Sequence, residues 1–310
     1  MIKQSSLTRD LILVVFALLL SIELSAQQDP QYTQYMYNTM SVNSAYAGQR
    51  DVLSITGLYR TQWVGIDGAP KTITFGAHSP LRNKRLGLGL NLGSDKLGPS
   101  SETNVDVNFS YTIPIDEIRG TELSFGLKGG FHLLNTDWSK GVYQYPDRVF
   151  NDNLNLFSPT VGAGLYLHSE QWYLGLSVPN FFTTEHYDGV QESIATERLH
   201  YFLIGGYVFD MSENMKLKPA VLVKGVSGAP LIADLSINAL FHEKLTLGLG
   251  YRWDDSISGL AGFQISEGLF IGYAYDLTTT NLNNYNSGSH EIMLRFELQQ
   301  IGRILSPRFF

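Results

Sequence analysis

The chain has 310 residues, of which 44% are hydrophobic and only 16% are charged, and it contains no cysteine. The lack of cysteine excludes a disulfide framework and thiol chemistry. The net charge of −7 argues against a nucleic-acid partner, because nucleic acids favour basic surfaces.

The first 26 residues have the features of an export signal. A positive start at Lys3 and Arg9 precedes an apolar run at residues 11–20, and small residues ending at Ala26 follow. This order is typical of a secretory signal peptide, and the apolar run is shorter than the roughly 20 residues of a membrane-spanning helix. We therefore expect residues 1–26 to be a signal peptide that is cleaved after Ala26.

Residues 27–50 differ from the rest of the chain. They show no alternation and are dense in tyrosine and glutamine, with rings at Tyr32, Tyr35, Tyr37 and Tyr46. One interpretation is a solvated tail. Because tyrosine gains by burying its ring and bonding its hydroxyl, we favour a segment that the rest of the chain encloses. In the β-barrel that the following residues predict, it would plug the lumen or cover its mouth, entering from the periplasmic side.

From residue 51 onward, apolar residues alternate with small or polar ones. In residues 104–113, for example, Val105, Val107 and Phe109 alternate with Asp106 and Asn108. Period two indicates strands with one apolar face, and runs of about ten such residues match tilted strands that span a membrane. Fourteen strands are predicted, at 51–63, 70–79, 85–95, 102–114, 121–134, 157–168, 171–180, 198–210, 215–226, 230–241, 244–253, 257–266, 268–277 and 288–298.

The even number of strands and their alternation predict an all-β fold, a transmembrane antiparallel up-and-down β-barrel in the outer membrane. The barrel would occupy residues 51–298, followed by a periplasmic tail at 299–310, with both termini periplasmic. A soluble periplasmic β-sandwich also alternates, but its strands are shorter and lack aromatic girdles. Aromatic residues that suit such girdles are Trp63, Trp138, Trp172, Tyr251 and Trp253.

The expected lumen face carries charges of both signs. Arg60, Lys128, Lys224, Arg252 and Arg295 share it with Asp106, Asp234, Glu291 and Glu297. Opposite charges in a narrow lumen tend to pair across it rather than line a selective pore. Together with many small residues on this face, they favour a plugged barrel over an open porin.

A catalytic or metal site is not expected. The pairs His290–Glu291 and His242–Glu243 are adjacent in sequence, so on a strand their side chains would point to opposite faces. Oxygen-bearing side chains that could gather a calcium ion occur in the longest connection, at Asp147, Asn151, Asp152, Asn153 and Asn155. A polar surface loop explains them as well, and no cofactor is predicted.

Several motifs resemble those of the PorP/SprF family, outer-membrane proteins of the type IX secretion and gliding system of Bacteroidetes. They begin with Asp29-Pro30-Gln31-Tyr32 and run in order along the chain to a terminal Ser306-Pro307-Arg308. The residues that carry the resemblance or could contact a partner are Asp29, Pro30, Tyr32, Tyr35, Tyr37, Asn38, Asn43, Tyr46, Gly48, Arg60, Trp63, Asp95, Gly98, Pro99, His290 and Glu291. Ser44 departs from the family pattern, which has proline at this position.

The resemblance implies a protein that binds, delivers or anchors cell-surface proteins through their C-terminal domains. Its expected partners are those domains, periplasmic components of the secretion and motility apparatus, and membrane lipid. A passive channel for small solutes is the alternative, and a barrel enzyme is a third.

Overall fold

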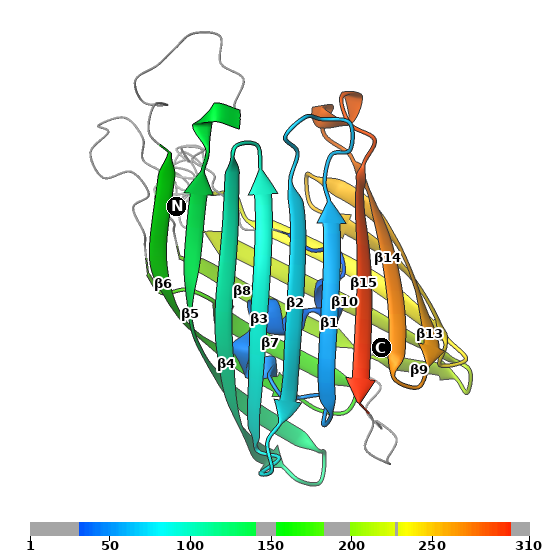
Figure 1. Ribbon diagram of the computed structural model, residues 1–310. Coiled ribbons are helices and arrows are strands. Elements are labelled where there is room, and N and C mark those ends of the chain that lie inside the picture. The colour runs from blue at the N-terminus through cyan, green and yellow to red at the C-terminus, as the bar shows by residue number, and fades with distance from the viewer. Residues whose placement is uncertain (1–30, 141–152, 183–198, 227–228, 299–310) are drawn as a thin grey trace, which may run out of the picture.

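The computed structural model describes residues 31–140, 153–182, 199–226 and 229–298. All of the described strands belong to one antiparallel sheet, which closes on itself (Figure 1). Closure is made by β1 (Leu53–Thr61), which pairs with β2 (Lys71–Pro80) on one side and with β15 (Ser289–Leu298) on the other. The expected signal peptide and C-terminal tail lie outside the described residues.

The wall has fourteen strands when one interrupted strand is counted once. β8 (His200–Tyr207) and β9 (Phe209–Ser212) both pair with β10 (Met215–Val226) and are separated only by the buried Val208. The predicted antiparallel barrel is therefore confirmed. The remaining strands are β3 (Leu86–Leu97), β4 (Ser100–Asp116), β5 (Thr121–Thr136), β6 (Leu154–His168), β7 (Trp172–Val178), β11 (Ile232–Phe241), β12 (Leu245–Arg252), β13 (Ser256–Ser266) and β14 (Leu269–Thr278).

The side chains of the wall alternate as the sequence predicts. On β3, Leu88, Leu90 and Leu92 are exposed on the outer surface, whereas Gly89 and Asn91 are buried on the lumen side. An apolar outer face matches the hydrocarbon of a bilayer, and the lumen face is free to carry polar groups. No helix among the described residues is long and apolar enough to cross a membrane.

Two ends of the barrel can be distinguished. At the short-turn end β1 begins, β15 ends, and the strands are joined by tight turns such as that between β11 and β12. There His242 and Glu243 have φ of 52° and 55°, and the N–H of Lys244 donates to the carbonyl of Phe241 at 3.0 Å, a turn whose twist matches that of its strands. The long-connection end carries the β5–β6, β7–β8 and β14–β15 connections, which are the longest ones, so the predicted alternation of connections is confirmed.

Strand lengths differ from the prediction in one part of the wall. β4, β5 and β6 have 17, 16 and 15 residues, whereas β7 has only seven. β7 stops at Val178 because Pro179 follows it and has no N–H to donate to a ladder. β6 consequently pairs with β7 only between Ala163 and His168.

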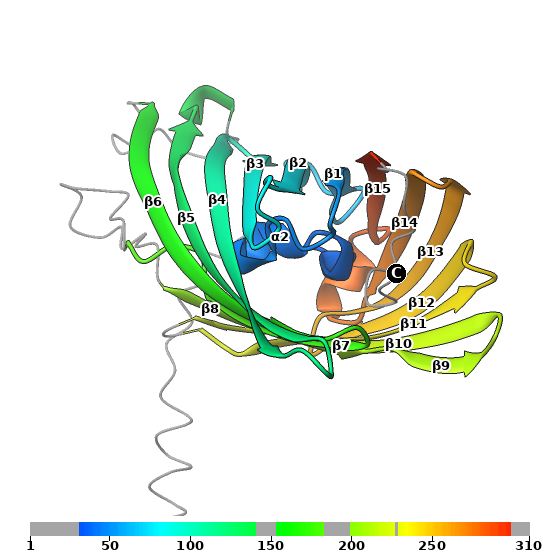
Figure 2. The ribbon, with the colours of Figure 1, turned by 90° about the horizontal axis from the view of Figure 1, so that it is seen from below.

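Residues 31–50, which we call the lumen segment, lie inside the barrel (Figure 2). They form three short helices: η1 (Tyr35–Tyr37), α2 (Thr39–Val42) and η2 (Ser44–Tyr46). Most of their side chains are buried and join those of the wall in one hydrophobic cluster. The core of this protein therefore lies inside its barrel.

Candidate functional site: the segment inside the barrel

The first turn of the lumen segment is held by charged groups on three strands that meet near the long-connection end. Glu291 accepts hydrogen bonds from the backbone N–H groups of Thr33 and Gln34, at 3.0 and 2.8 Å. The Thr33 hydroxyl donates to both oxygens of Asp276, at 2.7 and 2.8 Å. These contacts fix the backbone as well as the side chain of Thr33.

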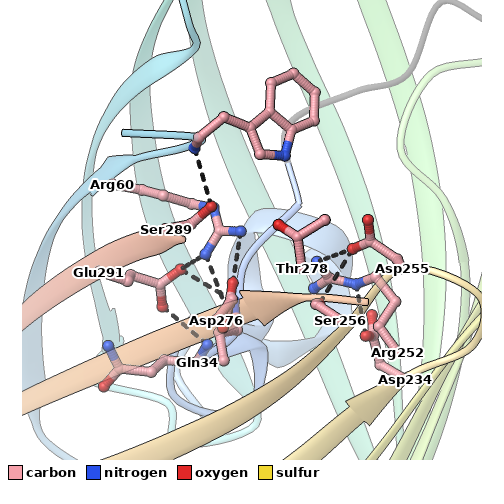
Figure 3. Close-up of polar contacts among 12 residues, drawn as sticks. Gln34, Arg60, Asp234, Arg252, Asp255, Ser256, Asp276, Thr278, Ser289 and Glu291 are labelled. Atoms are coloured by element: carbon pink, nitrogen blue, oxygen red, sulfur yellow. Dashed lines mark hydrogen bonds and ion pairs between the residues drawn. The ribbon is translucent and has the colours of Figure 1, made fainter. Parts of the chain in front are cut away.

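Arg60 pairs with both carboxylates of this group, which we call the upper anchor (Figure 3). Its guanidinium lies 2.7 Å from Asp276 and 3.1 Å from Glu291, and it donates to the Thr33 hydroxyl at 2.9 Å. Arg60 comes from β1, Asp276 from β14 and Glu291 from β15, so one residue of the segment bonds to three strands. All three charged side chains are at least 96% buried. Removing one of them would leave a buried charge without its partner, which is costly.

A second anchor holds the segment near the short-turn end. Arg50 pairs with Glu297 on β15. Just before it, the N–H of Gly48 donates to the Nδ1 atom of His78 at 3.1 Å, and Ser110 donates its hydroxyl to the carbonyl of Ala47 at 2.6 Å. The segment thus runs through the lumen from the long-connection end to the short-turn end. The expectation that it starts at the end where β1 begins is wrong for the described residues.

Glycines of the wall make room for the segment. A Cβ atom added at Gly126 would overlap the backbone of Ala45, and one at Gly87 would overlap the carbonyl of Ala47. At Gly164 an added Cβ would meet the side chain of Asn43. Small residues on the lumen face were predicted to leave space for a backbone, and these contacts confirm that they do.

The tyrosines of the segment pack into the wall. The Tyr46 ring meets Tyr166 edge-on at 5.5 Å between centroids, and Tyr37 lies 5.2 Å from Phe270. The Tyr35 hydroxyl shares a hydrogen bond of 3.2 Å with Ser236, and burial raises the pKa of Tyr35 above its usual value. Tyr35, Tyr37 and Tyr46 are therefore buried, each against a specific neighbour in the wall.

Two ion pairs among the predicted lumen charges join neighbouring strands of the wall. Lys128 pairs with Asp106 on the adjacent strand at 3.1 Å, and Arg252 pairs with Asp234 at 2.7 Å. The expectation of pairs that cross the lumen is wrong for these residues. The lumen segment separates opposite walls, and side chains of adjacent strands are within reach of each other.

The residues predicted to carry function fall into three groups. Asp29 and Pro30 lie outside the described residues. The second group lies within the lumen segment, where all of its residues are buried except the half-buried Tyr32. Arg60 and Glu291 belong with this group, because they hold the segment in the upper anchor. The third group consists of Trp63, Asp95, Gly98, Pro99 and His290, which lie toward the long-connection end.

Members of the third group have local structural roles. Gly98 has φ of +55° in the turn between β3 and β4, as turn chemistry requires, and Asp95 accepts a hydrogen bond from Thr72. The N–H of Trp63 donates to the hydroxyl of Ser289 at 3.2 Å. His290 bonds with the exposed Tyr273 at 2.7 Å, on the opposite face from Glu291, so the predicted separation of that pair is confirmed.

Three residues of the anchors were not singled out from the sequence. Thr33, Arg50 and Asp276 gave no signal of their own, although Asp276 has the strand phase of a lumen-facing position. Among the described residues there is no group of three His, Asp or Glu side chains that could hold a metal ion. Asp147, Asn151 and Asp152 of the candidate calcium loop lie outside the described residues.

A closed antiparallel barrel with an apolar outer face and a filled interior is an outer-membrane β-barrel. Its fold is similar to that of the CymD monoaromatic hydrocarbon channel, at a TM-score of 0.51 and 12% identity, covering 86% of this chain and 94% of that one. The Ralstonia pickettii toluene transporter TbuX is similar at a TM-score of 0.50 and 9% identity, covering 85% and 93%. Such low identity shows the fold alone.

The family is shown by the sequence itself. Residues 24–296 match the family described as type IX secretion system membrane protein PorP/SprF, so the chain belongs to the PorP/SprF family. No curated protein matches it. The protein is thus an outer-membrane barrel of the type IX secretion system.

Proposed function

We propose that this protein binds, delivers or anchors cell-surface proteins through their C-terminal domains, as a filled barrel without catalytic activity. The family match carries this proposal, because it assigns the chain to a protein-secretion system over nearly its whole length. The lumen segment supports it: a barrel whose lumen is occupied from one anchor to the other suits a platform better than a pore.

In this proposal the lumen segment and its anchors are the functional core. The segment would keep the lumen closed and hold the wall in one shape, so that its rims present fixed surfaces to partners. The long-connection end would face outward to surface proteins. The short-turn end, where β15 ends, would face periplasmic components of the apparatus.

A passive channel for small solutes is the second candidate, favoured by the channel and transporter among the similar folds. Deleting residues 31–46 separates the two. If the barrel is a platform, the wild-type protein should conduct little in planar bilayers, and the deletion should conduct more while surface display of type IX cargo falls. Heat-modifiable migration in gels checks that the deleted barrel still folds.

Two results would contradict the platform. Wild-type conductance equal to that of the deletion would favour the channel. Normal cargo display in cells that carry a folded deletion protein would show that the lumen segment has no part in the function.

A further inference from the structure

One strand of the wall has an edge along which no other described strand pairs with it. β6 is paired with β5 along its whole length, from Leu154 opposite Thr136 to His168 opposite Glu122. On its other side the ladder with β7 covers only Ala163–His168, and one backbone bond from Phe181 to the carbonyl of Val161 extends it. Within the described parts of the chain, the far edge of residues 154–160 has no strand beside it.

The direction of the backbone groups at this edge follows from Val161. Its carbonyl accepts from the Phe181 N–H at 2.7 Å and its own N–H donates to Asn180, so both groups point away from β5. The N–H and C=O of one strand residue point to the same side, and the direction alternates along the strand. The register with β5 has no bulge. Asn155, Phe157 and Pro159 therefore point their backbone groups to the open edge.

Pro159 fits this assignment. Proline has no N–H to donate, so within a sheet it is confined to unpaired edges, strand starts and bulges, and the β5–β6 ladder has no bulge at Pro159. On β6 it stands in the same phase as Asn155 and Phe157. The edge consequently offers two N–H donors and three carbonyl acceptors.

The part of this edge that starts at Leu154 lies beyond the membrane-spanning part of the wall. A tilted strand needs about 9–11 residues to span the hydrocarbon, and β6 has 15. β6 and β7 begin their pairing together at the short-turn end, where His168 lies opposite Tyr173. The surplus of β6 is therefore about four to six residues, 154–159 at most, and it lies at the long-connection end. This is where an open backbone edge is tolerated, because such an edge does not occur in the hydrocarbon.

We propose that residues 154–159 of β6 form a docking edge that takes up an extended segment of a surface protein's C-terminal region as an added β-strand. This proposal rests on the proposed function, and it names the surface that holds the cargo. A row of alternating donors and acceptors is satisfied only by another extended backbone, which is the chemistry of strand addition. Side chains supply selectivity: Phe157 is exposed on the outer face, stacked at 5.6 Å on Phe131, while Ser158 and Thr160 are buried on the lumen face.

Proline substitution tests the edge directly. Asn155→Pro removes a donor that faces the open edge and leaves the bonds to β5 intact. The native Pro159, four residues later and in the same strand phase, shows that β6 accepts a proline at such a position. Asn155→Ala keeps the N–H and is the matched control. The probe is a labelled C-terminal region, of about 100 residues, from a surface protein exported by the same secretion system. Its Kd for the full-length purified protein is measured in detergent micelles.

We expect Asn155→Ala to change the Kd by less than about twofold and Asn155→Pro to weaken it roughly tenfold, the effect of losing one hydrogen bond. Equal binding by the two variants would overturn the docking edge and leave the proposed function standing. If the wild-type protein does not bind the probe, both proposals fail. If Asn155→Pro instead abolishes self-association and leaves the Kd unchanged, the edge joins two copies of this chain and the cargo proposal is overturned.

A second measurement covers the case in which Asn155→Pro does not fold. A photoreactive side chain at Asn155 should crosslink to the probe, whereas the same group at Leu127, exposed on the outer face of β5 between two paired strands, should not. Equal crosslinking at the two positions, or none at Asn155, would overturn the docking edge.

Discussion

The inner and outer faces of a single strand of this barrel meet very different surroundings. On β5, a methyl group added at Gly126 would overlap the backbone of Ala45 in the lumen segment. A methyl group added three residues later at Gly129, on the outer face, would meet no atom within 4 Å. The lumen face is thus constrained by protein packing at atomic detail, whereas the outer face needs only to be apolar. The lumen of this barrel behaves as the core of a globular domain.

The upper anchor is where this contrast should be largest. Replacing Arg60 by alanine leaves Glu291 buried without its ion-pair partner and Asp276 with only the charge of Arg252 nearby, so we expect a loss of about 3–5 kcal/mol in the free energy of unfolding. Urea titration of the protein refolded in lipid vesicles measures it. The control is Lys140→Ala, which removes an exposed pair with Asp137 and should cost about 0–1 kcal/mol. Equal losses would mean that the anchor adds nothing to stability.

The outer face should respond to charge rather than to size. Val107 is half exposed on the outer face of β4, and placing arginine there should cost roughly 2–4 kcal/mol near the middle of the membrane. Val107→Ala should cost much less, because it leaves the face apolar. The same urea titration compares the two variants. If the arginine is tolerated as well as the alanine, the outer surface of β4 does not face lipid.

Where wall glycines contact the lumen segment, the lumen face should respond to size. We expect Gly126→Ala to cost about 1–3 kcal/mol, because it overpacks the contact with Ala45. Gly129→Ala should change stability by no more than about 0.5 kcal/mol. In a chain that lacks residues 31–46 the cost at Gly126 should disappear. A cost that persists in that chain would show that Gly126 serves the wall and not the segment.

The alternation of apolar and polar residues along the strands was enough to predict most of the fold. The alternation of Val107 and Asn108 places one on each face whatever the tertiary contacts are, so the strands and the lumen charges followed from the sequence. The extra length of β4 to β6 did not, because residues such as Ser100 and Ser101 look like a loop in sequence.

The anchors were harder to predict than the strands. Arg60 and Glu291 were noted as lumen charges, but their partner Thr33 lies in a segment without periodicity. Nothing in the sequence fixes how such a segment runs through a lumen. For the same reason its direction was predicted wrongly, and Asp276 was not singled out.

The position of the two anchors bears on how the barrel is assembled. β1 and β15 come from opposite ends of the chain, and Arg50 and Glu297 are 247 residues apart in sequence. Bringing such distant segments together is slow, since the entropy of a long loop is lost before any contact compensates for it. The lumen segment bridges this seam from inside: Thr33 bonds to both Arg60 and Glu291, and Arg50 pairs with Glu297 on β15. The same contacts that fill the lumen therefore also link β1 to β15, so each event favours the other: a seated segment holds the two strands of the seam together, and a closed seam holds the segment.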